Sequence, residues 1–217
     1  MDNTAVLTDR DLAQALLNIK AVTLAPDAPF TWASGLQSPI YCDNRQTLGY
    51  PALRRQITAA FAARVAAHNW TVDVVAGTAT AGIPHAAWLA DRLEKPMAYV
   101  RSAPKGHGKE NQIEGRVRTG DVVLLVEDLI STGGSALKAV DALRAAGAEV
   151  AAVVAIFTYG FPETAQRFTD AQVDLSVLSD FEALQAVALA EGLLSPAAAS
   201  VLADWQQAPE AWSAAHS

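Results

Sequence analysis

The stretch that most constrains this chain is residues 122–135, which read Val-Val-Leu-Leu-Val-Glu-Asp-Leu-Ile-Ser-Thr-Gly-Gly-Ser. The five leading apolar residues do not alternate with polar ones, a pattern typical of a parallel strand that is covered on both faces. Two neighbouring carboxylates, Glu127 and Asp128, come next, and a loop of small residues over 131–135 follows them. Apolar residues at helical spacing then predict an amphipathic helix over 136–146. The order of these segments indicates a buried parallel strand that ends in two acids and is followed by a loop and the first turn of a helix.

The 131–135 loop is a candidate anion site. The first N–H groups of a helix have no partner inside the helix, and the helix dipole adds positive character there, so an anion is stabilised without a lysine. The alternative is an ordinary N-cap by Ser or Thr. Two adjacent acids weaken that alternative, because they repel one another unless a cation or hydroxyl donors occupy the site. Neither a Walker loop nor a Gly-x-Gly-x-x-Gly motif is present. The sequence therefore predicts a sugar-phosphate site.

The expected strands alternate with expected helices along most of the chain. This alternation predicts an α/β fold with a doubly wound, mostly parallel sheet and flanking helices, in which ligands lie outside the carboxyl ends of the strands. We expect one domain over 1–217, with an N-terminal subregion of about residues 1–48 and a helical tail of about 181–217. Strands at 30–32 and 40–43 are expected to form a hairpin in the N-terminal subregion. Further expected strands are 72–76, 97–100, 150–157 and 173–178. One helix is expected to begin at Pro51, and another is expected to end at about Leu93.

Composition excludes several classes of function. The net charge is −7 and 51% of the residues are hydrophobic, which argues against a nucleic-acid-binding or membrane-binding surface. No run approaches about 18 consecutive apolar residues, and the N-terminus lacks a signal-peptide pattern. The single cysteine, Cys42, cannot form an intrachain disulfide, so a cytoplasmic location is expected.

Three segments together resemble one enzyme family. Residues 123–135 resemble the phosphoribosyl pyrophosphate (PRPP) motif of type I phosphoribosyltransferases. Residues 30–44 are similar to the N-terminal base-binding hairpin of orotate phosphoribosyltransferases, and residues 99–108 are similar to the mobile catalytic loop of that family. The resemblance runs over roughly residues 15–160. It implies a base-binding N-terminal hood and Mg²⁺-dependent transfer of the phosphoribosyl group from PRPP to orotate. The products would be orotidine 5-monophosphate and pyrophosphate, in pyrimidine nucleotide synthesis.

The resemblance also implies roles for individual residues. Lys105 is the expected catalytic lysine, acting with Arg101 and Asp128, and Arg101 and His107 are expected to contact pyrophosphate. Glu127 and Asp128 are expected at the ribose hydroxyls, near a Mg²⁺ ion held mainly by PRPP. The full expected PRPP-binding set is Arg101, Lys105, His107, Glu127, Asp128, Leu129, Ile130, Ser131, Thr132, Gly133, Gly134 and Ser135. The expected orotate-binding set is Tyr41, Cys42 and Ser131. Trp32 could equally be a core residue of the hairpin or part of the base site.

A cationic segment follows the expected strand at 97–100. Residues 101–118 contain five Lys or Arg and two Glu, a local net charge of +3 in an acidic chain. Such a patch suggests an anionic ligand, and pyrophosphate gains charge as its bond to carbon breaks. Residues 102–115 are glycine-rich and are expected to form a long flexible loop. By resemblance the protein is a homodimer in which this loop reaches the neighbouring active site.

The chain departs from the family pattern at a few positions. It has Ala33 and Ser102 where many members carry basic residues, and Thr80-Ala81 where some have a Tyr-Lys pair. An arginine that binds the orotate carboxylate in some members has no clear counterpart near Tyr159-Gly160, so the carboxylate-binding group is unassigned. Two other functions stay open: transfer to another base such as a purine, or a non-catalytic PRPP-sensing regulator that binds nucleic acid. The acidic composition disfavours the regulator.

Overall fold

A six-stranded sheet forms the centre of the protein. The computed structural model describes residues 7–32, 34–103 and 112–216. The strands are ordered β10-β9-β8-β5-β6-β7, and every pair is parallel except β6 with β7. Their bounds are β5 (Val74–Thr78), β6 (Met97–Val100), β7 (Ile113–Gly115), β8 (Val122–Ile130), β9 (Glu149–Thr158) and β10 (Asp174–Asp180). The doubly wound, mostly parallel sheet expected from the sequence is confirmed.

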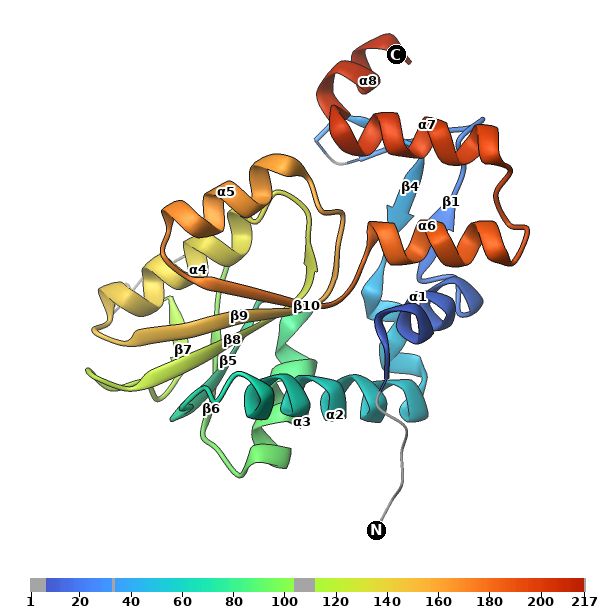
Figure 1. Ribbon diagram of the computed structural model, residues 1–217. Helices are drawn as coiled ribbons and strands as arrows, with labels where there is room; N and C mark the ends of the chain where they lie inside the picture. The colour runs from blue at the N-terminus through green and yellow to red at the C-terminus, as the bar shows by residue number, and fades with distance from the viewer. Residues whose placement is uncertain (1–6, 33, 104–111, 217) are drawn as a thin grey trace.

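Helices cover both faces of this sheet. Figure 1 shows α2 (Pro51–Ala67) and α3 (Gly82–Leu93) on one face, and α4 (Gly134–Ala145) and α5 (Pro162–Asp170) on the other. Strand β8 supplies both hydrophobic cores: Leu124 and Val126 belong to the core under α2 and α3, whereas Val123 and Leu125 belong to the core under α4. Burial on both faces explains why the run has no polar alternation.

Strand β8 extends beyond the predicted end at Val126. It pairs with β5 only as far as Val126, opposite Gly77, but its pairing with β9 continues to Ile130, opposite Thr158. Residues 127–130 therefore have a strand neighbour on one side only. The acid pair, Glu127 and Asp128, lies inside the strand at the point where β5 has ended.

The N-terminal hood differs from the expected hairpin. It contains α1 (Asp9–Asn18), β1 (Val22–Leu24), β2 (Phe30–Thr31), β3 (Gln37–Ser38), β4 (Ile40–Cys42) and the 3₁₀ helix η1 (Asn44–Gly49). Strand β2 pairs with β3, and β4 pairs with β1. The prediction that strands at 30–32 and 40–43 form one hairpin was therefore wrong. Pro39 separates β3 from β4. A proline has no N–H to donate to a ladder, so it ends one strand pair before the next begins.

The C-terminal tail is helical, as predicted, and packs near the hood. Its helices are α6 (Phe181–Ala190), α7 (Pro196–Gln207) and α8 (Pro209–Ala215). The main-chain N–H of Gln37 in β3 donates to Ser213 Oγ in α8 at 2.8 Å. Figure 1 shows α6 and α7 beside β1 and β4. Within the described ranges, no helix combines the length and apolar character needed to cross a bilayer.

The segment expected to be a long loop over 102–115 is partly a strand. Ile113–Gly115 forms β7, which pairs antiparallel with β6, and Arg101 and Gln112 exchange hydrogen bonds through Arg101 N–H and the Gln112 side chain. The remaining residues 104–111 lie outside the described residues.

Candidate active site

The 131–135 loop forms one wall of a pocket of about 270 Å³, called here the loop pocket. Its lining consists of Glu127, Leu129, Ile130, Ser131, Thr132, Gly133, Gly134, Ser135, Ala136 and Lys138. Gly133 stands at the N-cap of α4 with φ of 79°, and no side chain caps this helix. The alternative of a Ser or Thr N-cap was therefore wrong. The first N–H groups of α4 are without a side-chain acceptor, which suits them to an anion.

The acid pair lies beside this loop. Glu127 is 6% exposed and lines the loop pocket, and the N–H of Asp128 donates to Glu127 Oε1 at 3.0 Å. Burial, followed by the charge of Asp128, raises the pKa of Glu127 to about 8. Burial also raises the pKa of Asp128. Across the described ranges neither carboxylate forms an ion pair with a basic side chain. These two acids, neither of which is ion-paired, suit a ligand that brings positive charge or hydroxyl donors.

A second pocket, of about 350 Å³, adjoins the first and is called here the aromatic pocket. Its lining consists of Thr31, Trp32, Tyr41, Cys42, Leu129, Ser131 and Tyr159. Leu129 and Ser131 line both pockets, so the two spaces share a wall. Tyr41, Cys42 and Ser131, the expected orotate-binding set, all line this pocket. A flat apolar wall with a few polar groups is a typical setting for a heteroaromatic ring.

Trp32 and Tyr159 provide the largest flat surfaces of the aromatic pocket. Their ring centroids are 5.3 Å apart with an interplanar angle of 26°. Trp205 of α7 meets both rings edge-on, at 5.8 Å from Trp32 and 5.4 Å from Tyr159. Trp32 is thus a packing residue and a pocket residue at once. Tyr159 was missed as a site residue, although its position just beyond β9 is where parallel sheets place their ligand groups.

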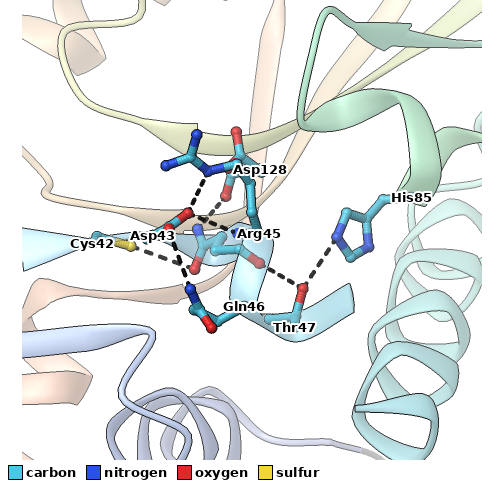
Figure 2. Close-up of polar contacts among 8 residues, drawn as sticks. Cys42, Asp43, Arg45, Gln46, Thr47, His85 and Asp128 are labelled. Atoms are coloured by element: carbon cyan, nitrogen blue, oxygen red, sulfur yellow. Dashed lines mark hydrogen bonds and ion pairs between the residues drawn. The ribbon is translucent and has the colours of Figure 1, made fainter. Parts of the chain in front are cut away.

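Asn44 connects the hood to the acid pair and was also missed. Its side chain, which is fully buried, donates from Nδ2 to the main-chain carbonyl of Asp128 at 2.6 Å and lies 3.4 Å from Cys42 Sγ. Thr47 Oγ1 donates to the carbonyl of Asn44 at 2.6 Å, and His85 Nε2 lies 3.3 Å from the same Thr47 oxygen (Figure 2). The turn that carries Asn44 is therefore fixed from α3 as well as from β8.

Other residues expected at the site lie elsewhere or outside the described residues. Arg101 lines neither pocket; its Nη1 lies 3.8 Å from Glu114 Oε1. Asp128 contributes its carbonyl to the Asn44 contact, but its side chain does not line either pocket. Lys105 and His107 fall within 104–111 and so lie outside the described residues. Lys138, on the second turn of α4, also lines the loop pocket and was not predicted as a site residue.

Comparison with known proteins decides the family. The phosphoribosyl transferase domain family matches residues 47–191. A protein of Halalkalibacterium halodurans named orotate phosphoribosyltransferase is 54% identical over 202 residues, covering 93% of this chain and 96% of that protein. The chain belongs to the orotate phosphoribosyltransferase family. Members of this family are pentosyltransferases, so the chain is an enzyme of that class.

Solved structures agree with this membership. The orotate phosphoribosyltransferase of Aeropyrum pernix has a TM-score of 0.71 and 30% identity, covering 85% of this chain and 99% of that one. The Leishmania donovani UMP synthase has a TM-score of 0.74 and 28% identity, covering 91% of this chain. This chain spans only 42% of that synthase. The acid pair and the 131–135 loop both fall inside the matched phosphoribosyl transferase domain.

Proposed function

We propose that the protein transfers the phosphoribosyl group of PRPP to orotate, in a Mg²⁺-dependent reaction of pyrimidine nucleotide synthesis that yields orotidine 5-monophosphate and pyrophosphate. One observation carries this proposal: a pocket suited to an anion and a pocket suited to a flat ring share Leu129 and Ser131 as a common wall. The two partners of the new glycosidic bond need such adjoining spaces.

The loop pocket supports the placement of PRPP. The uncapped N-terminus of α4 and the N–H groups of the 131–135 loop would hold the 5-phosphate. The ribose would then lie beside the acid pair, whose oxygens can accept from its 2- and 3-hydroxyls. As the bond from the anomeric carbon to pyrophosphate breaks, the sugar gains cationic character, which nearby carboxylates stabilise. Lys105 and Arg101 would interact with the charge that grows on the leaving pyrophosphate.

The donor set fits a magnesium ion that arrives with its substrate. No cluster of three His, Cys, Asp or Glu side chains close enough to hold a metal occurs within the described ranges. Mg²⁺ commonly combines one or two carboxylates with substrate phosphates and water, which is what Glu127 and Asp128 can offer. When bound, the ion would neutralise charge on the pyrophosphate and favour its departure.

Orotate would occupy the aromatic pocket. Trp32 and Tyr159 offer ring faces, Tyr41 offers an edge surface, and Cys42 and Ser131 offer polar contacts. A ring nitrogen of the base would attack the anomeric carbon across the shared wall.

We also propose that the active form is a homodimer in which the 102–115 loop completes the neighbouring active site. Mixing two inactive variants, Lys105→Ala and Asp128→Asn, tests this arrangement. A loop that works in the neighbouring site would give hybrid dimers with one intact site and restore part of the activity. Mixtures that stay inactive although subunits exchange would refute the arrangement.

The substrate assignment is tested by a spectrophotometric assay of orotate loss with PRPP and Mg²⁺. Orotate should be consumed, whereas uracil, hypoxanthine and guanine should not be converted at a comparable kcat/KM. Turnover of a purine with none of orotate would favour the alternative of the same fold acting on another base.

A further inference from the structure

We propose that helix α5 sets the direction of the N–H groups of the 131–135 loop, with Thr164 and Arg167 as positioning residues for phosphate binding. The inference rests on the proposed function in that the anion is taken to be the 5-phosphate of the sugar. Neither residue lines the loop pocket, so both would act through the loop.

Two side chains of α5 hold two consecutive carbonyls of the loop. Thr164 Oγ1 donates to the carbonyl of Ser131 at 2.9 Å. Arg167 Nη1 donates to the carbonyl of Thr132 at 3.2 Å. Thr164 and Arg167 are three residues apart, so they lie on the same face of the helix. Thr164 is only 3% exposed, so its hydrogen bond is shielded from water.

The geometry of the peptide bond means that these hydrogen bonds to the loop carbonyls also fix the direction of the neighbouring N–H groups. In a trans peptide the carbonyl of one residue and the N–H of the next point in opposite directions. The only cis peptide in the described part of the chain joins Ala79 and Thr80, so the loop peptides are trans. Because α5 draws the carbonyls of Ser131 and Thr132 toward itself, the N–H groups of Thr132 and Gly133 point away from α5. Thr132 and Gly133 line the loop pocket, to which α5 contributes no lining residue.

A third residue of the same helix face fixes the end of the loop. Phe168 lies four residues after Thr164 and packs against Gly133: a Cβ placed on Gly133 would lie 2.6 Å from Phe168 Cε2. Thr164, Arg167 and Phe168 thus contact Ser131, Thr132 and Gly133 in order. The sequential contacts keep the loop from rotating its peptides into the opposite orientation.

The cation of Arg167 adds an electrostatic contribution. A hydrogen bond from a charged donor polarises the accepting peptide, and a polarised peptide has a stronger N–H donor on its far side. The guanidinium also places positive potential behind a loop that would bind a dianion. Arg167 thereby assists anion binding without contacting the anion.

The decisive experiment measures binding of ribose 5-phosphate by calorimetry, without turnover, together with steady-state kinetics. In Thr164→Val the shape is kept but the donor is lost. We expect the Kd of ribose 5-phosphate and the KM for PRPP to rise about tenfold, as loss of a partly buried hydrogen bond to the loop implies. The kcat and the KM for orotate should change by less than about twofold. Thr164→Ser, which restores the hydroxyl, should recover the wild-type values.

A matched control is available on the same helix. Thr169 Oγ1 donates at 3.0 Å to the carbonyl of Ala165 within α5, away from the loop. Thr169→Val should leave the Kd of ribose 5-phosphate and the KM for PRPP unchanged.

Arg167 is a second test position, and it is exposed, so its substitution does not threaten folding. Arg167→Gln should weaken ribose 5-phosphate binding more than Arg167→Lys does.

The outcomes separate this inference from the proposed function. If the wild-type protein binds ribose 5-phosphate and Thr164→Val and Arg167→Gln bind it equally well, the positioning role is overturned and the proposed function stands. Failure of Thr164→Ser to recover binding would also overturn the role, because it would trace the loss to packing. If the wild-type protein does not bind ribose 5-phosphate at all, the placement of a phosphate in the loop pocket fails, and the inference falls with it.

Discussion

Asn44 donates a hydrogen bond of 2.6 Å to the main-chain carbonyl of Asp128, across 84 residues of sequence. The bond is made where β8 has lost β5 as its neighbour, after Val126. The amide therefore satisfies a carbonyl of β8 beyond its pairing with β5. Through this contact the hood, which supplies Tyr41 and Cys42 to the aromatic pocket, is fixed directly to the strand that carries the acid pair.

Replacing Asn44 by alanine is expected to destabilise the protein. The variant leaves the partly buried Asp128 carbonyl without its donor, which costs about 1–3 kcal/mol. Urea denaturation measures the loss. Asn18→Ala is the matched control, because the Asn18 side chain accepts from Gln14 on the exposed side of α1. Equal stabilities of the two variants would show that the Asn44 contact contributes nothing.

Removing the charge of Asp128 is expected to abolish most turnover and leave the fold intact. Asp128→Asn is isosteric, so the melting temperature should not fall, whereas kcat/KM should drop by about 100-fold or more if the carboxylate stabilises the cationic sugar. Asp174→Asn, at the exposed start of β10, serves as the control for charge change alone. Wild-type kcat/KM in Asp128→Asn would remove Asp128 from the site.

The ligand-free protein is expected to lose stability as the pH rises through the range in which Glu127 titrates. The folded-state pKa of Glu127, about 8, lies above the ordinary value of 4.5, so the unfolded chain releases this proton first. The stabilising contribution is complete below pH 4.5, declines as the pH rises toward 8 and is gone above it. Glu127→Gln should flatten this part of the profile, as measured by urea denaturation between these limits. Parallel profiles for both proteins would contradict the raised pKa.

Substituting Gly133 is expected to damage the loop through both strain and collision. An alanine there would keep φ near 79°, which costs about 1–2 kcal/mol, and its Cβ would meet the Phe168 ring. Gly192→Ala isolates the strain alone, since Gly192 has φ of 68° and no atom within 4 Å of the added Cβ. Ribose 5-phosphate affinity should fall in Gly133→Ala and stay unchanged in Gly192→Ala. Retention of affinity by Gly133→Ala would contradict the packing described for this loop.

Trp32 is expected to contribute to binding of the base rather than to the chemical step. Trp32→Leu removes the ring that stacks on Tyr159, and the KM for orotate should rise about fivefold to tenfold while the KM for PRPP stays constant. Trp70→Leu is a fitting control, because Trp70 stacks on His68 outside both pockets. An unchanged KM for orotate would place the base elsewhere.

The sequence predicted those parts of the site that depend on local pattern. The apolar run of β8, the stripe of α4 and the small residues between them are neighbours in the chain, so periodicity and turn chemistry were sufficient. Asn44, Tyr159 and Thr164 were missed because their roles depend on contacts with residues 84, 127 and 33 positions away, namely Asp128, Trp32 and Ser131. The hairpin prediction was wrong because two runs of strand-forming residues do not reveal which partner each will take. Pro39, read as a ladder breaker, was the signal that could have corrected it.

The hydrogen bond from Gln37 to Ser213 has a consequence for biosynthesis. The aromatic pocket needs walls from β2, from the end of β9 and from the packing of α7 and α8 behind them, so its parts span almost the entire chain. The loop pocket is lined by residues 127–138 and braced by β9 and α5, so its parts lie close together in the sequence. Because synthesis runs from the N-terminus, the segments that line and brace the loop pocket are made before α7 and α8, which pack behind the aromatic pocket.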